Sequence, residues 1–229
     1  MLGDRRLMVT IQLFSLLQKS TFLRKSYLKS LACSAKLIDR MLNIDTVSQP
    51  AKAINHHTRF GDSLRDDAYS YLKLWKYSNL LKPTRQDIVF DIGCGAGRIL
   101  CVIARRPVQK CVGIEISTEY AERARQNARQ LNGRKAPIEI IVADAAEADY
   151  SGGTIYCLFN PFGTKTLEVV LERIHQSVRK HPRCIRVAYF NAAFENVLES
   201  CGWLKCYMHE DSTLTKRWGR TSLWTNVKS

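Results

Sequence analysis

The segment Val89–Arg98 constrains the fold of this 229-residue chain more than any other. An apolar run ends in Asp91, and three glycines follow at alternate positions, Gly93, Gly95 and Gly97, before a helical pattern begins. Glycine adopts positive φ readily and lets a ligand approach the backbone, and the first turn of a helix presents unpaired N–H groups. The segment therefore predicts a strand, a tight ligand-binding turn and a helix, the opening unit of an α/β fold.

Strand and helix patterns then alternate along the chain. Strands are expected at Asp87–Ile92, Lys110–Ile116, Pro137–Ala143, Thr154–Phe159 and Cys184–Phe190, with helices at Gly95–Ala104, Ser117–Leu131, Lys165–Arg179 and Ala192–Cys201. Two last strands, Trp203–His209 and Trp218–Asn226, are joined by a hairpin-sized link without a helix. Because parallel neighbours need crossover connections, we expect an α/β fold with a doubly wound, mostly parallel seven-stranded sheet and an antiparallel C-terminal hairpin.

The first quarter of the chain has a different character. Residues 1–61 are predicted to form a helical, basic N-terminal extension with a linker or lid, and residues 62–229 the α/β domain. The period of Phe22–Leu42 predicts a helix with an apolar face and a basic stripe, the latter made of Lys25, Lys29, Lys36 and Arg40. A second helix is expected from Asp62 to Leu81, with candidate buried positions at Tyr69, Leu72 and Leu80.

Charge and cysteine content indicate which partners and which cellular compartment to expect. The net charge is +14, and half of it comes from residues 1–60, which hold ten Lys/Arg and three Asp/Glu. This excess suits a nucleic acid or an acidic partner at the basic helix, and a solvated face on a helix packed against the core is the alternative. No apolar run approaches the ~18 residues of a membrane span. Eight cysteines without a Cys-x-x-Cys pair suit reduced thiols, so we expect a cytoplasmic protein.

A metal site is not expected from the sequence. Cys201, Cys206 and His209 come nearest to a set of metal ligands. However, Cys201-Gly202-Trp203 has the pattern of a helix end running into a strand, which does not favour zinc.

Acidic residues follow at the tips of the second and third predicted strands. Glu115 lies beside Ile116, where its carboxylate can accept hydrogen bonds from both hydroxyls of a ribose; helix capping is the alternative. Asp144, followed by Ala145, can accept a hydrogen bond from an adenine amino group; a plain turn aspartate is the alternative. Because the tips of successive strands reach the same crevice, we expect these residues in one cofactor site.

A dinucleotide site is the obvious rival. Nicotinamide and flavin sites space their glycines Gly-x-Gly-x-x-Gly to seat a pyrophosphate. Here the third glycine comes one residue early, at Gly97, and Asp91 precedes the turn. A carboxylate there suits a cationic ligand better than a pyrophosphate, which disfavours a dehydrogenase.

Taken together, the acid at Asp91, the three glycines, Glu115, Asp144 and the terminal strand pair resemble the class I S-adenosylmethionine-dependent methyltransferases. The resemblance covers about residues 85–229 and implies S-adenosyl-L-methionine as the cofactor. It implies that the glycine loop lies under the methionine part, that Glu115 binds ribose and that Asp144 contacts adenine. Ile116 and Ala145 adjoin these acids and are assigned to the same site.

The fourth predicted strand ends in Asn160-Pro161-Phe162, the position that faces the transferred methyl group in this family. The element is similar to the Asn/Asp-Pro-Pro-Tyr/Phe motif of amino-group methyltransferases, in which the Asn side chain holds the target amine and the aromatic ring packs on it. This chain has one proline, and its Phe comes one place early; a structural Asn-Pro turn with a core Phe is the alternative. A looser similarity extends to the non-SET histone lysine methyltransferases.

The expected function is methyl transfer from S-adenosylmethionine to an acceptor in a protein, a nucleic acid or a small molecule. Nitrogen is the favoured acceptor atom, and Asn160, Pro161 and Phe162 are the candidate catalytic residues. Asn160 is also a candidate cofactor contact. A catalytically vestigial module that binds nucleic acid or protein is the alternative function.

Overall fold

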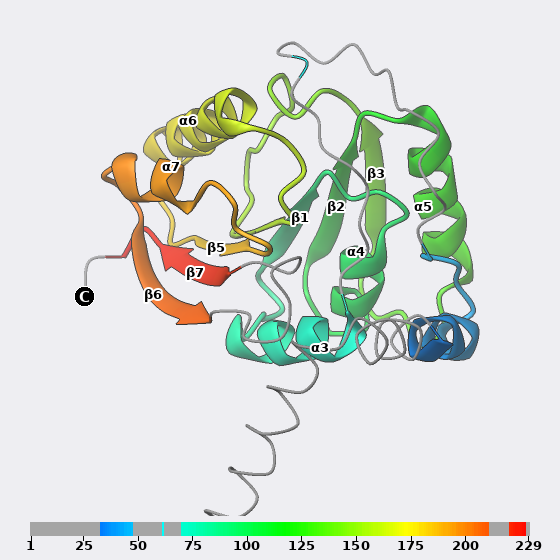
Figure 1. The fold of residues 1–229 in the computed structure, drawn as a ribbon. Helices are drawn as coiled ribbons and strands as arrows, with labels where there is room; N and C mark the ends of the chain where they lie inside the picture. The colour runs from blue at the N-terminus through cyan, green and yellow to red at the C-terminus, as the bar shows by residue number, and fades with distance from the viewer. Residues whose placement is uncertain (1–32, 48–60, 62–69, 211–219, 228–229) are drawn as a thin grey trace, which may run out of the picture.

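A computed structural model describes residues 33–47, 61, 70–210 and 220–227. Its centre is one seven-stranded sheet in the order β3-β2-β1-β4-β5-β7-β6 (Figure 1). The strands are β1 Ile88–Ile92, β2 Lys110–Glu115, β3 Ile138–Val142, β4 Ile155–Leu158, β5 Arg186–Tyr189, β6 Lys205–Glu210 and β7 Thr221–Thr225. Strands β1 to β5 run parallel to one another, and β7 runs antiparallel to both β5 and β6. The predicted fold class and terminal hairpin are confirmed.

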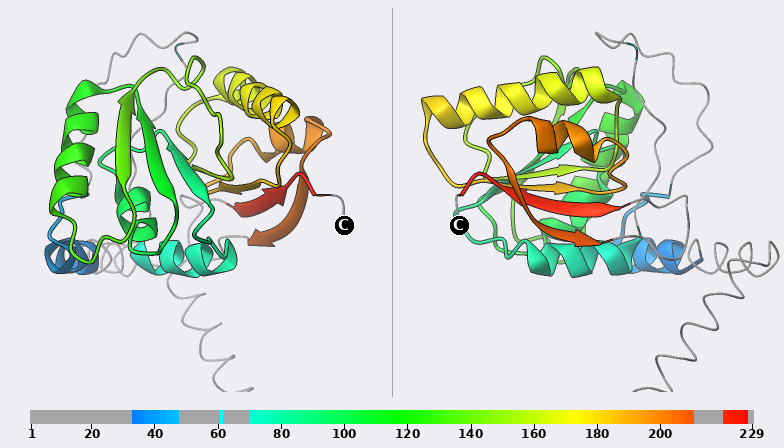
Figure 2. Two further views of the ribbon diagram at one scale, coloured as in Figure 1. Left: turned by 180° about the vertical axis from the view of Figure 1, so that it is seen from behind. Right: turned by 60° about the vertical axis from the view of Figure 1, so that its left-hand side comes forward.

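Helices cover both faces of the sheet, as the turned views of Figure 2 show. One face carries α3 Tyr71–Leu80, α4 Arg98–Ile103 and α5 Thr118–Gln130, together with a helix over residues 33–42. The other carries α6 Thr164–Lys180 and α7 Glu195–Ser200. Two hydrophobic clusters fill the spaces between these layers, one on each side of the sheet. This arrangement leaves the carboxyl ends of the parallel strands as the edge at which loops can form a site.

Local signals set several boundaries. Ser117 begins α5 as predicted, because its hydroxyl accepts a hydrogen bond from the backbone N–H of Tyr120 at 3.3 Å. No helix separates β3 from β4, since residues 143–154 form turns. Ile141 and Val142 of the edge strand β3 are exposed.

The helix predicted over 62–81 is described only from Ser70 onward, so its predicted start and Tyr69 lie outside the described residues. Two of the predicted buried positions are wrong: Leu72 and Leu80 are exposed. The buried face is instead formed by Tyr71, Leu74 and Tyr77. Apolar residues occur on both sides of this helix, and hydrophobicity alone did not identify which side faces the core.

The described part of the N-terminal extension packs into the same core as the sheet. Leu42 and Ile44 belong to the cluster that also holds α3, α4 and α5 residues. On the opposite side of the helix, Lys36 and Arg40 are exposed, as expected for a basic stripe. A domain boundary after residue 61 stays a prediction. Within the described ranges, no helix is both long and apolar enough to cross a membrane.

Candidate functional site at the carboxyl edge of the sheet

The predicted site residues lie at the ends of neighbouring strands. Asp91 is in β1, Glu115 ends β2, and Asp144 lies two residues beyond β3. Asn160 follows β4 by two residues, and Tyr189 ends β5. Because β1 to β5 are parallel, the topology brings all of these positions to one edge of the sheet.

The glycine loop is fastened to the tip of β2. The backbone N–H groups of Gly93 and Cys94 donate to the Ile114 carbonyl at 2.9 and 3.0 Å. The N–H of Gly95 donates to Glu115 Oε2 at 2.8 Å, and the N–H of Ser117 donates to Glu115 Oε1 at 2.9 Å. Glu115 is buried. Hydrogen bonds to an ionised carboxylate are strong, so Glu115 holds the loop and the start of α5 in fixed positions around itself.

The loop conformation requires glycine. Gly93, Gly95 and Gly97 have φ of 75°, 52° and 83°, a region that other residues enter only with strain. A side chain would also be crowded at Gly93 and Gly97. A Cβ on Gly93 would lie 2.4 Å from Pro161 Cβ, and one on Gly97 would lie 3.3 Å from the Cβ of Ala124 in α5. The glycine loop therefore lies directly against the Asn160-Pro161 turn.

Gly93→Ala is expected to weaken binding of S-adenosylhomocysteine by about tenfold or more, because positive φ alone costs about 1–2 kcal/mol in other residues. The contact with Pro161 adds to this cost, because neither the new Cβ nor the proline Cβ can move away without a shift of the backbone. Titration calorimetry checks the affinity. Gly202→Ala is the matched control, because Gly202 has a similar φ of 72° but nothing within 4 Å of the added Cβ. Equal affinity of Gly93→Ala and wild type would contradict the role of this contact.

The turn that follows β3 is held by hydrogen bonds within itself. Asp144 Oδ1 accepts a hydrogen bond from the Ala146 N–H at 2.9 Å, and the Ala145 carbonyl accepts one from the buried Tyr150 hydroxyl at 2.7 Å. The N–H of Ala143 donates to the Glu115 carbonyl at 3.0 Å, which places this turn beside the tip of β2. Ile116 is half-buried at the same tip.

The Asn160 turn has a partner that the sequence did not suggest. Asn160 has a φ of 46°, a conformation that Asn tolerates better than most residues. The hydroxyl of Tyr189 donates to Asn160 Oδ1 at 2.9 Å. Tyr189 is buried, and burial raises the pKa of its phenol well above the usual range, so the hydroxyl stays a donor. Phe162 is also buried and lies in the hydrophobic cluster beneath α6, and its predicted contact with the acceptor stays a prediction.

A second unexpected group is the strap formed by residues 44–47. Asn127 of α5 accepts a hydrogen bond from the Asp45 N–H at 2.8 Å and donates to the carbonyls of Asp45 and Ala96. Arg98, which follows the glycine loop, donates to Thr46 through its Nε and Nη2 atoms. The strap is thus bonded directly to Arg98, and through Asn127 to Ala96 of the loop. An Asn or Thr in isolation carries no sequence signal for such a role.

The residues at this edge fit a nucleoside with a cationic substituent. Gly93, Gly95 and Gly97 leave three positions of the loop without a side chain, and glycine positions let a ligand lie close to the backbone. Two carboxylates, Asp91 and Glu115, adjoin it at the tips of β1 and β2. One carboxylate can accept hydrogen bonds from the two hydroxyls of a ribose. A second carboxylate nearby favours a ligand with positive charge over one with a phosphate.

Comparisons with known proteins agree with this reading. A family model described as a methyltransferase domain matches residues 89–181, from β1 to the end of α6. A protein-lysine N-methyltransferase of Saccharolobus islandicus is 36% identical over 81 residues, which are 35% of this chain and 50% of that protein. A histone-lysine N-methyltransferase of Dictyostelium discoideum, specific for H3 lysine 79, is 33% identical over 69 residues, 30% of this chain and 4% of that protein. The chain thus spans at most half the length of these two relatives.

Solved structures give the same fold. An RNA methyltransferase from Salinibacter ruber, solved with S-adenosyl-L-homocysteine, superposes with a TM-score of 0.52 at 20% identity, covering 71% of this chain and 95% of that one. At this identity the likeness concerns the fold alone.

Proposed function

Because this chain contains a class I S-adenosylmethionine-dependent methyltransferase domain, we propose that it transfers a methyl group to a nitrogen atom, with a lysine side chain of a protein as the favoured acceptor. The two relatives named above are both lysine N-methyltransferases, which supports the choice of atom. The Asn160 turn at the methyl-transfer position supports it independently.

We assign the cofactor site to Asp91, the glycine loop, Glu115 and Asp144. When bound, S-adenosylmethionine supplies a methyl group on a sulfonium. The sulfur departs as a neutral thioether, so the transfer needs neither a metal nor a covalent intermediate. The work of the protein is then to orient the two reactants and to exclude water. Glu115 would receive the ribose hydroxyls, Asp144 the adenine amino group, and Gly93 to Gly97 would support the methionine part. Ile116 and Ala145 would flank the base.

One observation carries the proposal for the acceptor: the glycine loop touches the Asn160-Pro161 turn at Gly93. The loop that would carry the methyl donor and the turn that would hold the acceptor are therefore in contact. An amide oxygen at Asn160 would accept an N–H of a neutral amine and so direct the nitrogen lone pair toward the methyl carbon. The Tyr189 hydroxyl holds that oxygen in place. A fixed orientation of the two reactants lowers the activation barrier of the transfer. Phe162 would support the turn from behind.

Asn160→Gly is expected to lower kcat by about 100-fold, because loss of positioning costs rates of that order. Glycine is chosen because it accepts the φ of 46° without strain. Asn43→Gly is the matched control: Asn43 has a φ of 57° and donates to Gln130 at the far end of α5. Affinity for S-adenosylhomocysteine should change little in Asn43→Gly, and a fall in Asn160→Gly would measure the candidate contact of Asn160 with the cofactor. Unaltered kcat in Asn160→Gly would remove Asn160 from the acceptor site.

The acceptor class is tested by transfer of labelled methyl groups into a cell lysate that is then fractionated. Label in protein, recovered as methyl-lysine after hydrolysis, is the expected result. Label in RNA would instead make nucleic acid the acceptor, and activity should then fall steeply with salt. Label in small molecules alone would refute a macromolecular acceptor. No label, together with no calorimetric binding of S-adenosylhomocysteine, would favour a vestigial binding module.

A further inference from the structure

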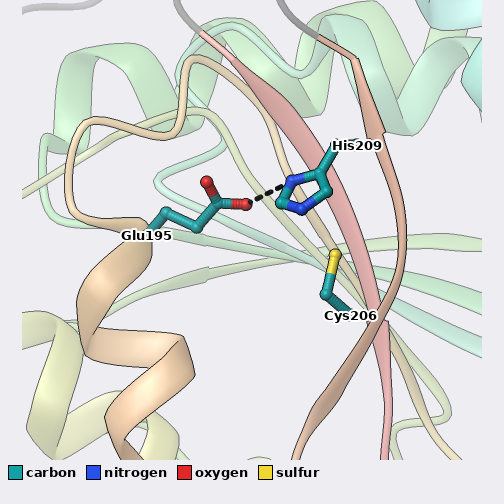
Figure 3. Close-up of side chains that lie close together, drawn as sticks. All are labelled: Glu195, Cys206 and His209. Atoms are coloured by element: carbon teal, nitrogen blue, oxygen red, sulfur yellow. Dashed lines mark ion pairs between the residues drawn. The ribbon is translucent and has the colours of Figure 1, made fainter.

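Three side chains of types that can bind a metal gather beside the terminal hairpin. They are Glu195 at the start of α7 and Cys206 and His209 of β6, with one ligand atom of each lying within 4.8 Å of the others (Figure 3). We propose that Glu195, Cys206 and His209 bind a divalent transition-metal ion, with zinc as the best-suited metal. This site is independent of the methyl-transfer proposal.

A β-bulge brings the two strand residues together. Side chains three positions apart on a regular strand point to opposite faces. Between Cys206 and Met208 the register shifts, so that Cys206 pairs with Trp224 and His209 with Ser222. Trp224 and Ser222 are themselves two residues apart on β7 and share a face, the one covered by α7. The bulge therefore turns His209 onto the face of Cys206 and toward Glu195, and bulges are known to redirect side chains at functional positions.

The carboxylate of Glu195 is held where it can serve this site. Glu195 is buried at the first turn of α7, and its Oε2 accepts a hydrogen bond from Arg220 Nη1 at 2.8 Å. The other oxygen, Oε1, faces Nδ1 of His209 at 3.1 Å, and among the described residues it accepts no hydrogen bond. A buried carboxylate oxygen needs a hydrogen-bond donor or a cation beside it. The imidazole of His209 can supply the first, and a metal ion bound between Oε1, Nδ1 and the thiol would supply the second.

The ligand set favours zinc over its competitors. Thiolate, imidazole and carboxylate are all zinc ligands, at bond lengths of about 2.0–2.3 Å, whereas magnesium and calcium prefer oxygen alone. Such bonds put tetrahedral ligands about 3.3–3.8 Å apart, so the present separations close by small side-chain shifts. Burial raises the pKa of the Cys206 thiol, and metal binding would displace its proton. Water would take the fourth position.

The sequence drew attention to Cys201 in place of Glu195. In the structure, Cys201 donates to the Leu198 carbonyl at 2.9 Å and is not a member of the group. Glu195 is eleven residues from Cys206 and has no spacing signal. The ion would tie α7 to β6, and so secure the last strands of the sheet.

The test is titration of the full, reduced chain with Co²⁺, whose bonds to thiolate absorb in the near ultraviolet. We expect this band to saturate at one Co²⁺ per chain and to disappear when Zn²⁺ is added. Cys206→Ser should abolish the band, and His209→Ala should weaken Co²⁺ binding at least tenfold. Cys201→Ser is the matched control and should leave both unchanged. Circular dichroism of each variant establishes that it is folded.

Several results would overturn the inference. A chain that gives no thiolate band holds only the ion pairs among His209, Glu195 and Arg220. A band that survives Cys206→Ser arises at another cysteine. As a second readout, Zn²⁺ should raise the Tm of the wild type but not of His209→Ala, and a Tm that Zn²⁺ leaves unchanged in both would also refute the site.

Discussion

Replacing Glu115 with Gln is expected to weaken binding of S-adenosylhomocysteine by about 100-fold or more, because each hydrogen bond to a charged group contributes about 1.5–3 kcal/mol. Gln has the same shape, so the loss does not come from packing. Both carboxylate oxygens accept backbone N–H groups, from Gly95 and Ser117. Gln has one oxygen and one NH₂, and the NH₂ must face one of these donors. The variant therefore disturbs the glycine loop as well as the ribose acceptor.

Calorimetry with S-adenosylhomocysteine measures the effect, and Glu119→Gln provides the control. Glu119 is exposed in the first turn of α5, near Glu115 in sequence but outside its hydrogen bonds. Removing an exposed charge there should lower the stability of the helix by about 0.3–1 kcal/mol at most. If Glu115→Gln bound the ligand as tightly as Glu119→Gln does, the ribose assignment would be wrong.

The sheet was predictable because its signals are local. Apolar runs, turn glycines and the absence of a helix between the last two strands determined seven strands and the direction of the hairpin. The strand-tip residues followed from the same argument, since a parallel sheet brings Glu115 and Asp144 to one edge. Ser117 was recognisable as an N-cap for an equally local reason.

Features that depend on contacts between distant segments were not predictable. Tyr189 meets Asn160 across 29 residues, and Asn127 meets Asp45 across 82. The bulge in β6 is a property of its pairing with β7; regular alternation would place Cys206 and His209 on opposite faces. The same limit explains the error at Leu72, because an amphipathic helix with apolar residues on both sides is oriented only by what it packs against.

A buried polar network bonds part of the predicted N-terminal extension to the rest of the described structure. Asp39 accepts hydrogen bonds from the hydroxyl of Tyr71 and from the backbone and hydroxyl of Thr46. Arg98 Nη2 lies 4.0 Å from Asp39 Oδ2, and its guanidinium stacks 4.8 Å above the Tyr71 ring. Asp39, Thr46, Tyr71 and Arg98 are all buried. One carboxylate thus joins the N-terminal helix, α3 and the first residue of α4.

Asp39→Ala is expected to lower the free energy of unfolding by about 3–5 kcal/mol, because removing one partner leaves the Arg98 charge buried without its carboxylate. Urea denaturation measures this loss. Asp45→Ala is the control: its carboxylate pairs with Arg123 at 2.7 Å but is 67% exposed, and such surface pairs contribute about 0–1 kcal/mol.

Asp39→Ala should also weaken binding at the cofactor site. Arg98 directly follows Gly97 and is bonded to Thr46, so losing the network frees one end of the glycine loop. Affinity for S-adenosylhomocysteine should therefore fall in Asp39→Ala even under conditions where the variant is fully folded. If stability fell but affinity did not, residues 33–47 would act as a brace for the core alone. If neither changed, the buried carboxylate would contribute to neither folding nor binding.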